Sequence, residues 1–134
     1  MSAFFDTNLI VYAQQEGQKG ERARALLSEG GSLSVQVLNE FVAVARRKLG
    51  KDWDEIDAAI DDALALLEPP VALTLDTHNV ARALARAHDF SFYDALIVAA
   101  ALEAGCGTLY SEDMQNGLKI GALTIVDPFV ARQP

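Results

Sequence analysis

The chain has 134 residues, of which 51% are hydrophobic and 22% charged, and its formal net charge is −8 at pH 7. The length is that of one domain, and the apolar fraction is too high for a disordered chain. The acidic balance excludes a protein that holds nucleic acid by bulk positive charge, because such proteins are usually basic.

The compartment is indicated by the single cysteine and by the absence of a targeting pattern. Cys106 has no intramolecular disulfide partner, which suits a reducing environment, and a cysteine-based metal site is not expected. The first six residues lack a basic segment and contain Asp6, so we expect no signal peptide. The longest apolar run, residues 95–102, is too short for a membrane span of about 20 residues. We therefore expect a cytoplasmic protein.

The first half of the chain predicts two short strands and four helices. Strands are expected over residues 2–5 and 33–35, and helices over residues 9–13, 21–27 and 35–49. Residues 14–20 are polar with two glycines and predict a break. A fourth helix, opened by Asp52 or Asp54 and reaching Leu67, has the clearest amphipathic stripe.

The second half alternates strands with helices. Pro69 and Pro70 end the fourth helix, and residues 71–75 predict a third strand. We expect Asp76 to cap a helix that reaches about His88, and a further helix over residues 91–104. Strands are expected at residues 108–110 and 123–126. This order predicts an α/β fold in which helices cover both faces of a parallel sheet.

Acidic side chains lie where such a sheet places its ligands, beyond the carboxyl ends of the strands. Each acid also has a structural interpretation: Asp6, Asp76 and Asp113 as caps, Asp94 as part of a capping box with Ser91, and Glu40 as a solvated residue about 200° from Leu38 on a helical wheel.

Taken together, four acids on separate segments suggest a metal site, because clustered carboxylates repel one another unless a cation lies among them. Oxygen ligands without cysteine or histidine favour Mg²⁺ or Mn²⁺, and such an ion activates water and stabilises charge on a phosphate.

The same segments resemble the motifs of the PIN-domain family, in order along essentially the whole chain. Residues 4–8 (FFDTN) are similar to its opening strand and Asp-Thr/Ser-Asn motif, and residues 39–41 (NEF) to its glutamate-bearing helix. Residues 91–101 (SFYDALIVAAA) closely resemble its third-acid helix, and residues 109–114 (LYSEDM) its Thr/Ser-x-Asp segment. The ending, residues 125–129 (IVDPF), is also similar to family members.

The resemblance implies one PIN domain over residues 1–134, with a three-layer α/β/α fold and about five short strands. The compact size points to VapC-type toxins of toxin–antitoxin pairs. These are metal-dependent endoribonucleases whose products carry 5′-phosphate and 3′-hydroxyl ends. The expected partners are an RNA substrate, a cognate antitoxin and a second copy in a homodimer, with no membrane.

Carried onto this sequence, the resemblance makes Asp6, Glu40, Asp94 and Asp113 the catalytic acids, which bind one or two Mg²⁺ or Mn²⁺ ions. It implies that two further side chains orient ligands or waters, and these are Asn8 and Ser111. Thr7 is expected to support the turn, and Glu112 stands at the variable position of its motif, where a ligand is less expected.

Two groups of side chains outside the motifs have open roles. Arg46, Arg47 and Lys48 lie about two turns beyond Glu40, and either contact the RNA backbone or form a solvated helix end. The two histidines lie on or beside the helix at 76–88, away from every motif, so we expect ordinary surface or packing roles for them.

Three alternatives to a ribonuclease remain. The first is a non-catalytic PIN-fold binding or regulatory protein, the second is a PIN nuclease that acts on DNA, and the third is a receiver domain with its own Mg²⁺ pocket. A receiver domain requires an acidic pair after the first strand, which is missing here. Asp76 can be assigned as its phospho-accepting aspartate and Lys119 as its late lysine. Glu40 and Asp113 then have no role.

Overall fold

A computed structural model describes residues 2–130 of the chain. Its sheet has the order β1-β2-β4-β3, formed by β1 (Ala3–Phe5), β2 (Thr108–Tyr110), β3 (Lys119–Ile120) and β4 (Leu123–Val126). β1, β2 and β4 are parallel, whereas β3 pairs antiparallel with β4. The predicted α/β fold is confirmed, with four strands in the described residues instead of about five.

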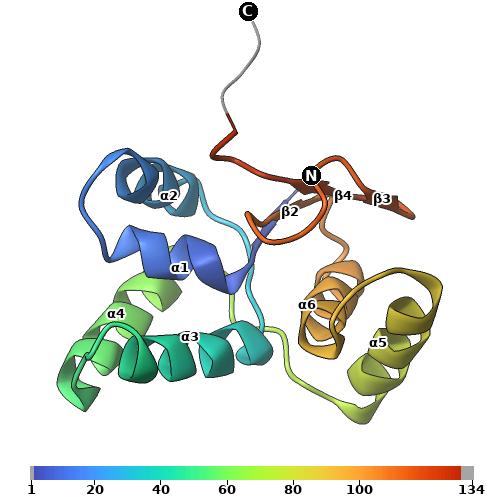
Figure 1. The fold of residues 1–134 in the computed structure, drawn as a ribbon, viewed down its shortest axis with the longest axis horizontal. Helices are drawn as coiled ribbons and strands as arrows, with labels where there is room; N and C mark the ends of the chain where they lie inside the picture. The colour runs from blue at the N-terminus through green and yellow to red at the C-terminus, as the bar shows by residue number, and fades with distance from the viewer. Residues whose placement is uncertain (1, 131–134) are drawn as a thin grey trace, which may run out of the picture.

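Six helices surround this sheet within residues 2–130 (Figure 1). They are α1 (Thr7–Ala13), α2 (Gln18–Ser28), α3 (Val35–Arg47), α4 (Trp53–Leu66), α5 (Leu75–Ala87) and α6 (Phe92–Glu103). Figure 1 shows α1 to α4 on one side of the molecule, while α5 and α6 form a pair on the other. None of the helices in the described part of the chain has the length and apolar character needed to cross a bilayer.

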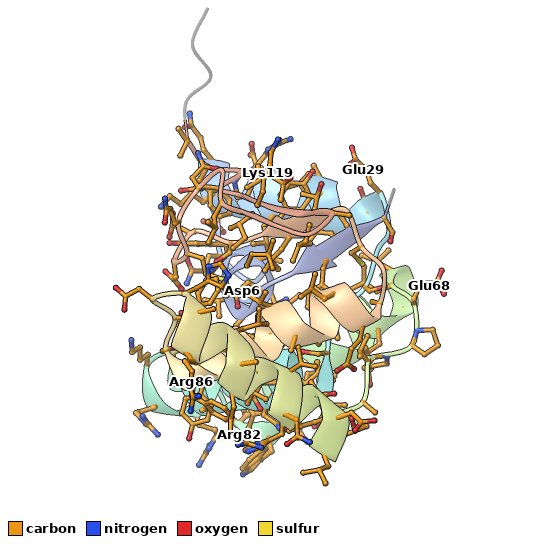
Figure 2. The ribbon with its side chains drawn as sticks, turned by 90° about the vertical axis from the view of Figure 1, so that its right-hand side faces the viewer. Asp6, Glu29, Glu68, Arg82, Arg86 and Lys119 are labelled. Atoms are coloured by element: carbon orange, nitrogen blue, oxygen red, sulfur yellow. The ribbon has the colours of Figure 1, made fainter. Side chains whose placement is uncertain are left out.

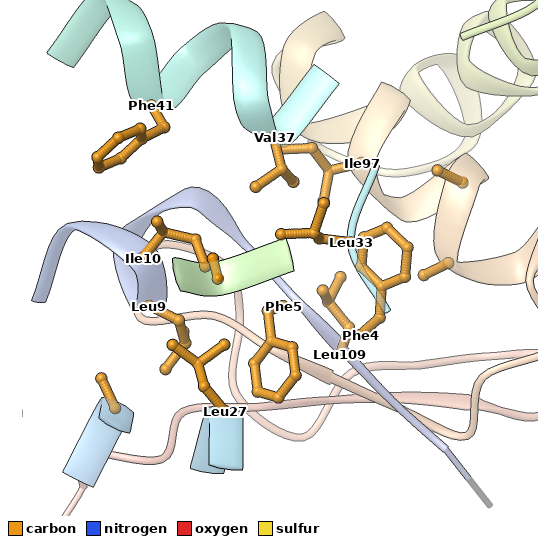
Figure 3. Packing of buried hydrophobic residues seen from close by; sticks show 14 of the residues in the cluster. Phe4, Phe5, Leu9, Ile10, Leu27, Leu33, Val37, Phe41, Ile97 and Leu109 are labelled. Carbon is orange, nitrogen blue, oxygen red and sulfur yellow. The ribbon is translucent and has the colours of Figure 1, made fainter. Parts of the chain in front are cut away.

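Helices cover both faces of the sheet, but not equally. Phe4 and Phe5 point to opposite faces of β1, and neither has any exposed surface. Figure 3 shows Phe5 turned toward Leu27 of α2, and Phe4 turned away from it. On the face of the sheet to which Phe4 points, Leu109 of β2 and Ile125 of β4 are also fully buried. On the face to which Phe5 points, Tyr110 of β2 is only half-buried. The second layer of helices is therefore partial.

The central helix is α6, which is buried along most of its length. Its residues 95–101 are all buried, as expected for a helix that is apolar all round. It packs against α5 and also contacts α3. This placement holds the N-terminal turn of α6, with Asp94, at a defined position beside α3.

The predicted strands at 33–35 and 71–75 are wrong. These segments form only one isolated bridge, between Ser34 and Val71, and Ser32, just before the first of them, forms another with Phe4. Neither segment extends into a strand because an N-cap residue within it starts a helix. The Ser34 side chain accepts a hydrogen bond from Val37 N at the start of α3, and the Thr74 side chain accepts one from Thr77 N at the start of α5. The short strand β3 was missed because residues 119–120 have little alternation to mark them.

Asp76 is not the cap that we predicted. Thr74 is the N-cap of α5 in a reciprocal arrangement with Thr77, and Asp76 lies in the first turn, where its charge favours the helix dipole. The first two helices also begin earlier than predicted, because Asp6 caps α1 and the turn at Gly17, with φ of 100°, precedes α2.

Candidate active site

One open pocket of about 370 Å³ lies beyond the carboxyl ends of β1 and β2. All four predicted acids line it, and each comes from a different part of the chain: Asp6 after β1, Glu40 on α3, Asp94 at the start of α6 and Asp113 after β2. The structure thus brings together the acids that the motifs singled out, while Asp76 does not line this pocket.

Asp6 is the deepest of these acids, with 3% of its surface exposed. Its Oδ1 accepts a hydrogen bond from Thr7 N at 2.6 Å, and its Oδ2 accepts one from Ser111 Oγ at 2.6 Å. Burial raises the pKa of Asp6 to about 7 against these two hydrogen bonds, and the charges of Asp94 and Glu40 raise it further. Asp6 therefore serves both as the cap of α1 and as a carboxyl that loses its proton only near neutral pH.

Glu40 and Asp94 are both half-buried. Burial raises the pKa of Glu40, a hydrogen bond from Gln36 Nε2 to Glu40 Oε2 at 3.0 Å opposes this, and the charges of Asp94 and Asp113 add to the rise. Burial likewise raises the pKa of Asp94, with a contribution from Asp113. The helical wheel was thus misleading for Glu40, because the side of α3 away from its apolar stripe faces the other acids instead of open solvent.

Asn8 and Ser111 connect the acids by hydrogen bonds. The Asn8 amide donates to Asp113 Oδ2 at 3.1 Å and to Asp6 Oδ2 at 3.4 Å, and its oxygen accepts from Glu112 N at 3.3 Å. Ser111, which is fully buried, donates to Asp6 and accepts from Asp113 N at 3.2 Å. Asn8 therefore contacts the carboxylates of two segments, whereas Ser111 contacts the Asp6 carboxylate and the backbone of Asp113.

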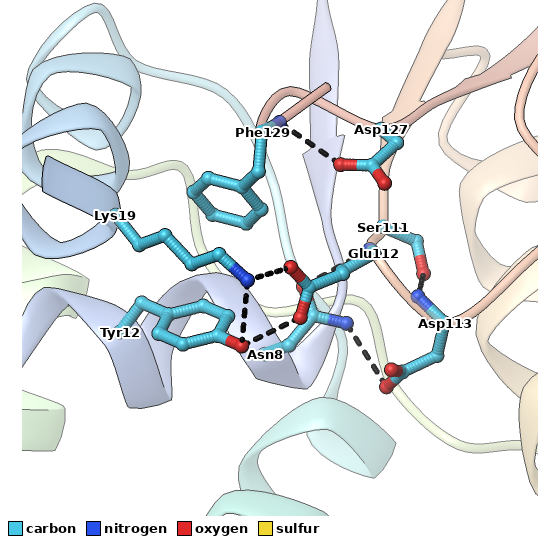
Figure 4. Close-up of polar contacts among 8 residues, drawn as sticks. All are labelled: Asn8, Tyr12, Lys19, Ser111, Glu112, Asp113, Asp127 and Phe129. Atoms are coloured by element: carbon cyan, nitrogen blue, oxygen red, sulfur yellow. Dashed lines mark hydrogen bonds and ion pairs between the residues drawn. The ribbon is translucent and has the colours of Figure 1, made fainter. Parts of the chain in front are cut away.

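Glu112 is held away from the other acids by partners of its own (Figure 4). It forms an ion pair with Lys19 and accepts a hydrogen bond from the Tyr12 hydroxyl. Burial acts to raise the pKa of Glu112, but the hydrogen bonds from Lys19 and Tyr12 outweigh it, and the pKa is lowered. The Lys19 ammonium also lies 5.0 Å from the centre of the Tyr12 ring and 5.5 Å from that of Phe129.

The predicted basic residues divide between the pocket and the outer surface. Lys48 lines the pocket with Glu40, whereas Arg46 and Arg47 do not. The Arg46 guanidinium lies 5.0 Å from the centre of the exposed Trp53 ring and donates to Lys51 O at 3.1 Å. On α5, Arg82 and Arg86 line a separate surface hollow, and Figure 2 shows them well apart from Asp6.

The donor set of the pocket suits a hard divalent ion. Apart from the Tyr12 phenol, its ionisable oxygen groups are carboxylates, and neither of the two histidines nor Cys106 lines it. This composition is typical of Mg²⁺ or Mn²⁺ sites and unlike zinc sites. Within residues 2–130 no three such side chains are grouped closely enough to hold a metal as they stand.

Several residues of the site were missed from the sequence. Tyr12 and Val44 line the pocket, and Gln36 supports Glu40. Gln36 and Val44 each lie four residues from Glu40, which places them on the same face of α3. This spacing is the sequence signal that could have found both. Thr7 also lines the pocket, and its Oγ1 is a buried oxygen without a hydrogen-bond partner among the described residues.

The family model of the PIN domain matches residues 3–115. The chain belongs to the PIN-domain family, and its matched region includes all four acids. No curated protein matches the sequence.

Three solved structures show the same fold. A toxin–antitoxin complex from Klebsiella pneumoniae matches with a TM-score of 0.70 and 20% identity, over 96% of this chain and 98% of that one. Mycobacterium tuberculosis VapC20, a toxin that cleaves the sarcin–ricin loop, gives 0.69 and 24%, over 84% and 90%. VapBC2 from Rickettsia felis, bound to a DNA fragment from its promoter, gives 0.67 and 19%, over 93% and 97%. The fold is thus that of VapC toxin–antitoxin proteins.

Proposed function

We propose that this protein is a metal-dependent endoribonuclease, the toxin of a type II toxin–antitoxin pair. The observation that carries the proposal is the pocket to which four separate segments contribute Asp6, Glu40, Asp94 and Asp113. The raised pKa of Asp6 supports it, because strongly perturbed acids in a cleft are typical of functional sites. Membership of the PIN family supports a nuclease, and VapC20, described as cleaving the sarcin–ricin loop, makes RNA the favoured substrate.

In this proposal the four acids hold one or two Mg²⁺ or Mn²⁺ ions, consistent with the oxygen donors of the pocket. A bound ion of this kind supplies the activation of water and the stabilisation of charge on the phosphate. Asn8 and Ser111 keep the carboxylates of Asp6 and Asp113 in place through their hydrogen bonds.

The chain's own cations have a smaller part in holding the RNA. Lys48 at the pocket edge contacts a phosphate of the substrate, because among residues 2–130 it is the one basic residue that lines the pocket. Arg46 and Arg47 contact the RNA backbone only farther from the cut, and Arg46 must first leave the Trp53 ring.

The proposed partners follow from the same family. Two of the structural neighbours are described as toxin–antitoxin assemblies, which favours a cognate antitoxin for this chain. A homodimer and a cytoplasmic location complete the proposal.

The deciding experiment compares the wild type with Asp6→Asn on RNA. In Mg²⁺ or Mn²⁺ the wild type is expected to produce new RNA 5′ ends, mapped by sequencing after induced expression and with purified protein. Asp6→Asn is expected to keep the fold and lose at least about a hundredfold in cleavage rate, because the deepest carboxylate is gone.

A matched control is Asp76→Asn, which removes one exposed acid in the first turn of α5. It is expected to cleave like the wild type. Equal cleavage by well-purified Asp6→Asn would contradict the proposal, and cleavage of DNA in preference to RNA would shift it to the DNA alternative.

A further inference from the structure

A second hollow adjoins the acidic pocket and shares two of its walls. It encloses about 150 Å³, and both Asp94 and Asp113 line it as well as the main pocket. Its other walls come from the segment between α5 and α6 and from the loop after β2. They are formed by His88, Asp89, Phe90, Met114, Gln115 and Leu118. No motif predicted this hollow.

The lining combines flat and apolar groups with one exposed amide. His88 and Phe90 are both half-buried, and their ring centres lie 5.7 Å apart with an interplanar angle of 47°. Met114 closes the inner side, with 7% of its surface exposed. Gln115 is exposed at the rim, where its amide offers two donors and one acceptor.

The charge of these walls selects the kind of group that enters. Asp89, Asp94 and Asp113 all line the hollow, and no lysine or arginine among the described residues does. A phosphate is therefore repelled, whereas a neutral aromatic ring finds both a stacking surface and hydrogen-bond acceptors. The volume is below the range of about 300–1,000 Å³ typical of drug-sized ligands, which suits a single ring system.

We propose that this hollow receives one unstacked base of the RNA, from a nucleotide next to the cleaved bond. The inference rests on the proposed ribonuclease function and adds a determinant of its sequence preference. The base stacks on the His88 ring and meets the tilted Phe90 ring with its edge, in the way that single-stranded RNA bases use aromatic side chains. Because Asp94 and Asp113 line both hollows, a base held here places its phosphate at the acidic pocket.

Asp89 decides which bases are accepted. It is not one of the four acids assigned to metal, so its carboxylate is available to accept a hydrogen bond from an exocyclic amino group. Adenine, cytosine and guanine have such a group and uracil does not. A preference against uracil at one position beside the cut follows.

The two histidines provide a matched pair for the test. His78 packs edge-to-face against Phe92 with ring centres 5.1 Å apart, much as His88 packs against Phe90, and both are half-buried. Only His88 lines the hollow. Replacing each by alanine removes a similar aromatic contact, and only one replacement changes the proposed base site.

The experiment uses random-sequence single-stranded RNA with Mn²⁺ and sequencing of the cleaved ends. The wild type is expected to disfavour uracil at one flanking position, and Asp89→Asn to raise the frequency of uracil there. His88→Ala is expected to lower kcat/KM on the preferred RNA about tenfold through lost stacking, while His78→Ala stays within about twofold. Melting temperatures, measured alongside, separate these effects from unfolding.

Three outcomes overturn the inference. They are equal kcat/KM for the two histidine variants, base frequencies in Asp89→Asn that match the wild type, and a wild type that cuts without base preference. Each leaves the ribonuclease proposal standing, provided that Asp6→Asn abolishes the cleavage. A wild type that cleaves no RNA overturns the proposed function, and the base site with it.

Discussion

At the scale of single residues, Asp6 carries two demands that conflict. Its carboxylate caps α1 through Thr7 N, which favours the ionised form, yet it is buried beside two other acids, which favours the neutral form. Burial prevails, and the pKa rises from 3.8 to about 7. The acid at this position therefore lowers the stability of the native protein at neutral pH.

Removing this carboxylate is expected to stabilise the metal-free protein at neutral pH. Between pH 3.8 and about 7 the native Asp6 holds a proton that the unfolded chain has lost, so the free energy of unfolding falls as pH rises. Asp6→Asn has no carboxyl to titrate at this position, so this fall in the free energy of unfolding is absent from the variant. Thermal unfolding in the presence of a chelator should show the variant more stable at pH 8, on the order of 1–4 kcal/mol, with little difference near pH 4.

Asp57→Asn, on the exposed side of α4, is the control for the loss of one negative charge. A difference between Asp6→Asn and the wild type that stays constant from pH 4 to pH 8 contradicts the raised pKa.

At the scale of elements, one polar and aromatic cluster connects four segments at the rim of the pocket. Tyr12 on α1 and Lys19 on α2 contact each other, and both contact Glu112 after β2 and Phe129 after β4. The rings of Tyr12 and Phe129 meet edge-to-face at 5.0 Å. This cluster, shown in Figure 4, fixes the position of Glu112, and the Glu112 N–H donates a hydrogen bond to Asn8 Oδ1.

The titration of Tyr12 reports on this cluster. The hydrogen bond to Glu112 raises the pKa of Tyr12, as does burial, whereas Lys19 lowers it. Glu112→Gln is therefore expected to shift the ultraviolet titration of the Tyr12 phenol to lower pH, and Lys19→Met to higher pH. Tyr12→Phe identifies which part of the signal belongs to Tyr12, since the chain has three tyrosines. Shifts in the same direction for both variants contradict the arrangement.

At the scale of the whole molecule, the net charge is −8, and about half of it lies at the pocket where the substrate is expected to bind. In the part of the chain that the structure describes, four acids and Glu112 line the pocket, and Lys48 is the one basic residue that does. An RNA phosphate is repelled from such a surface, so a divalent cation is the counter-charge that the proposed function requires.

Mn²⁺ is therefore expected to stabilise the wild type against heat. Binding to the native state alone contributes about 2.7 kcal/mol at a metal concentration 100 times the Kd. Asp94→Asn should show a smaller rise in melting temperature at the same Mn²⁺ concentration, because one oxygen ligand is lost. The exposed Asp76→Asn serves as control and should match the wild type. Equal rises in the wild type and Asp94→Asn exclude Asp94 as a ligand.

The helices, the strands β1, β2 and β4, and the four acids that line the pocket were predictable from the sequence. Helix periodicity, glycine stops and the buried strand before Asp6 are local signals, which depend on residues close in the chain. The same local signals failed where two of them overlapped. Residues 33–35 and 71–75 have strand composition, but Ser34 and Thr74 start helices there, and capping took precedence.

Only the tertiary structure decided how the acids meet and what surrounds them. The raised pKa of Asp6, the separation of Glu112 from the other acids and the hollow beside His88 each depend on residues distant in sequence. His88 had no motif around it, and its position became informative once α5 and α6 placed it beside Asp94. Sequence patterns record which face of an element is apolar, whereas burial and charge at a site depend on which elements pack together there.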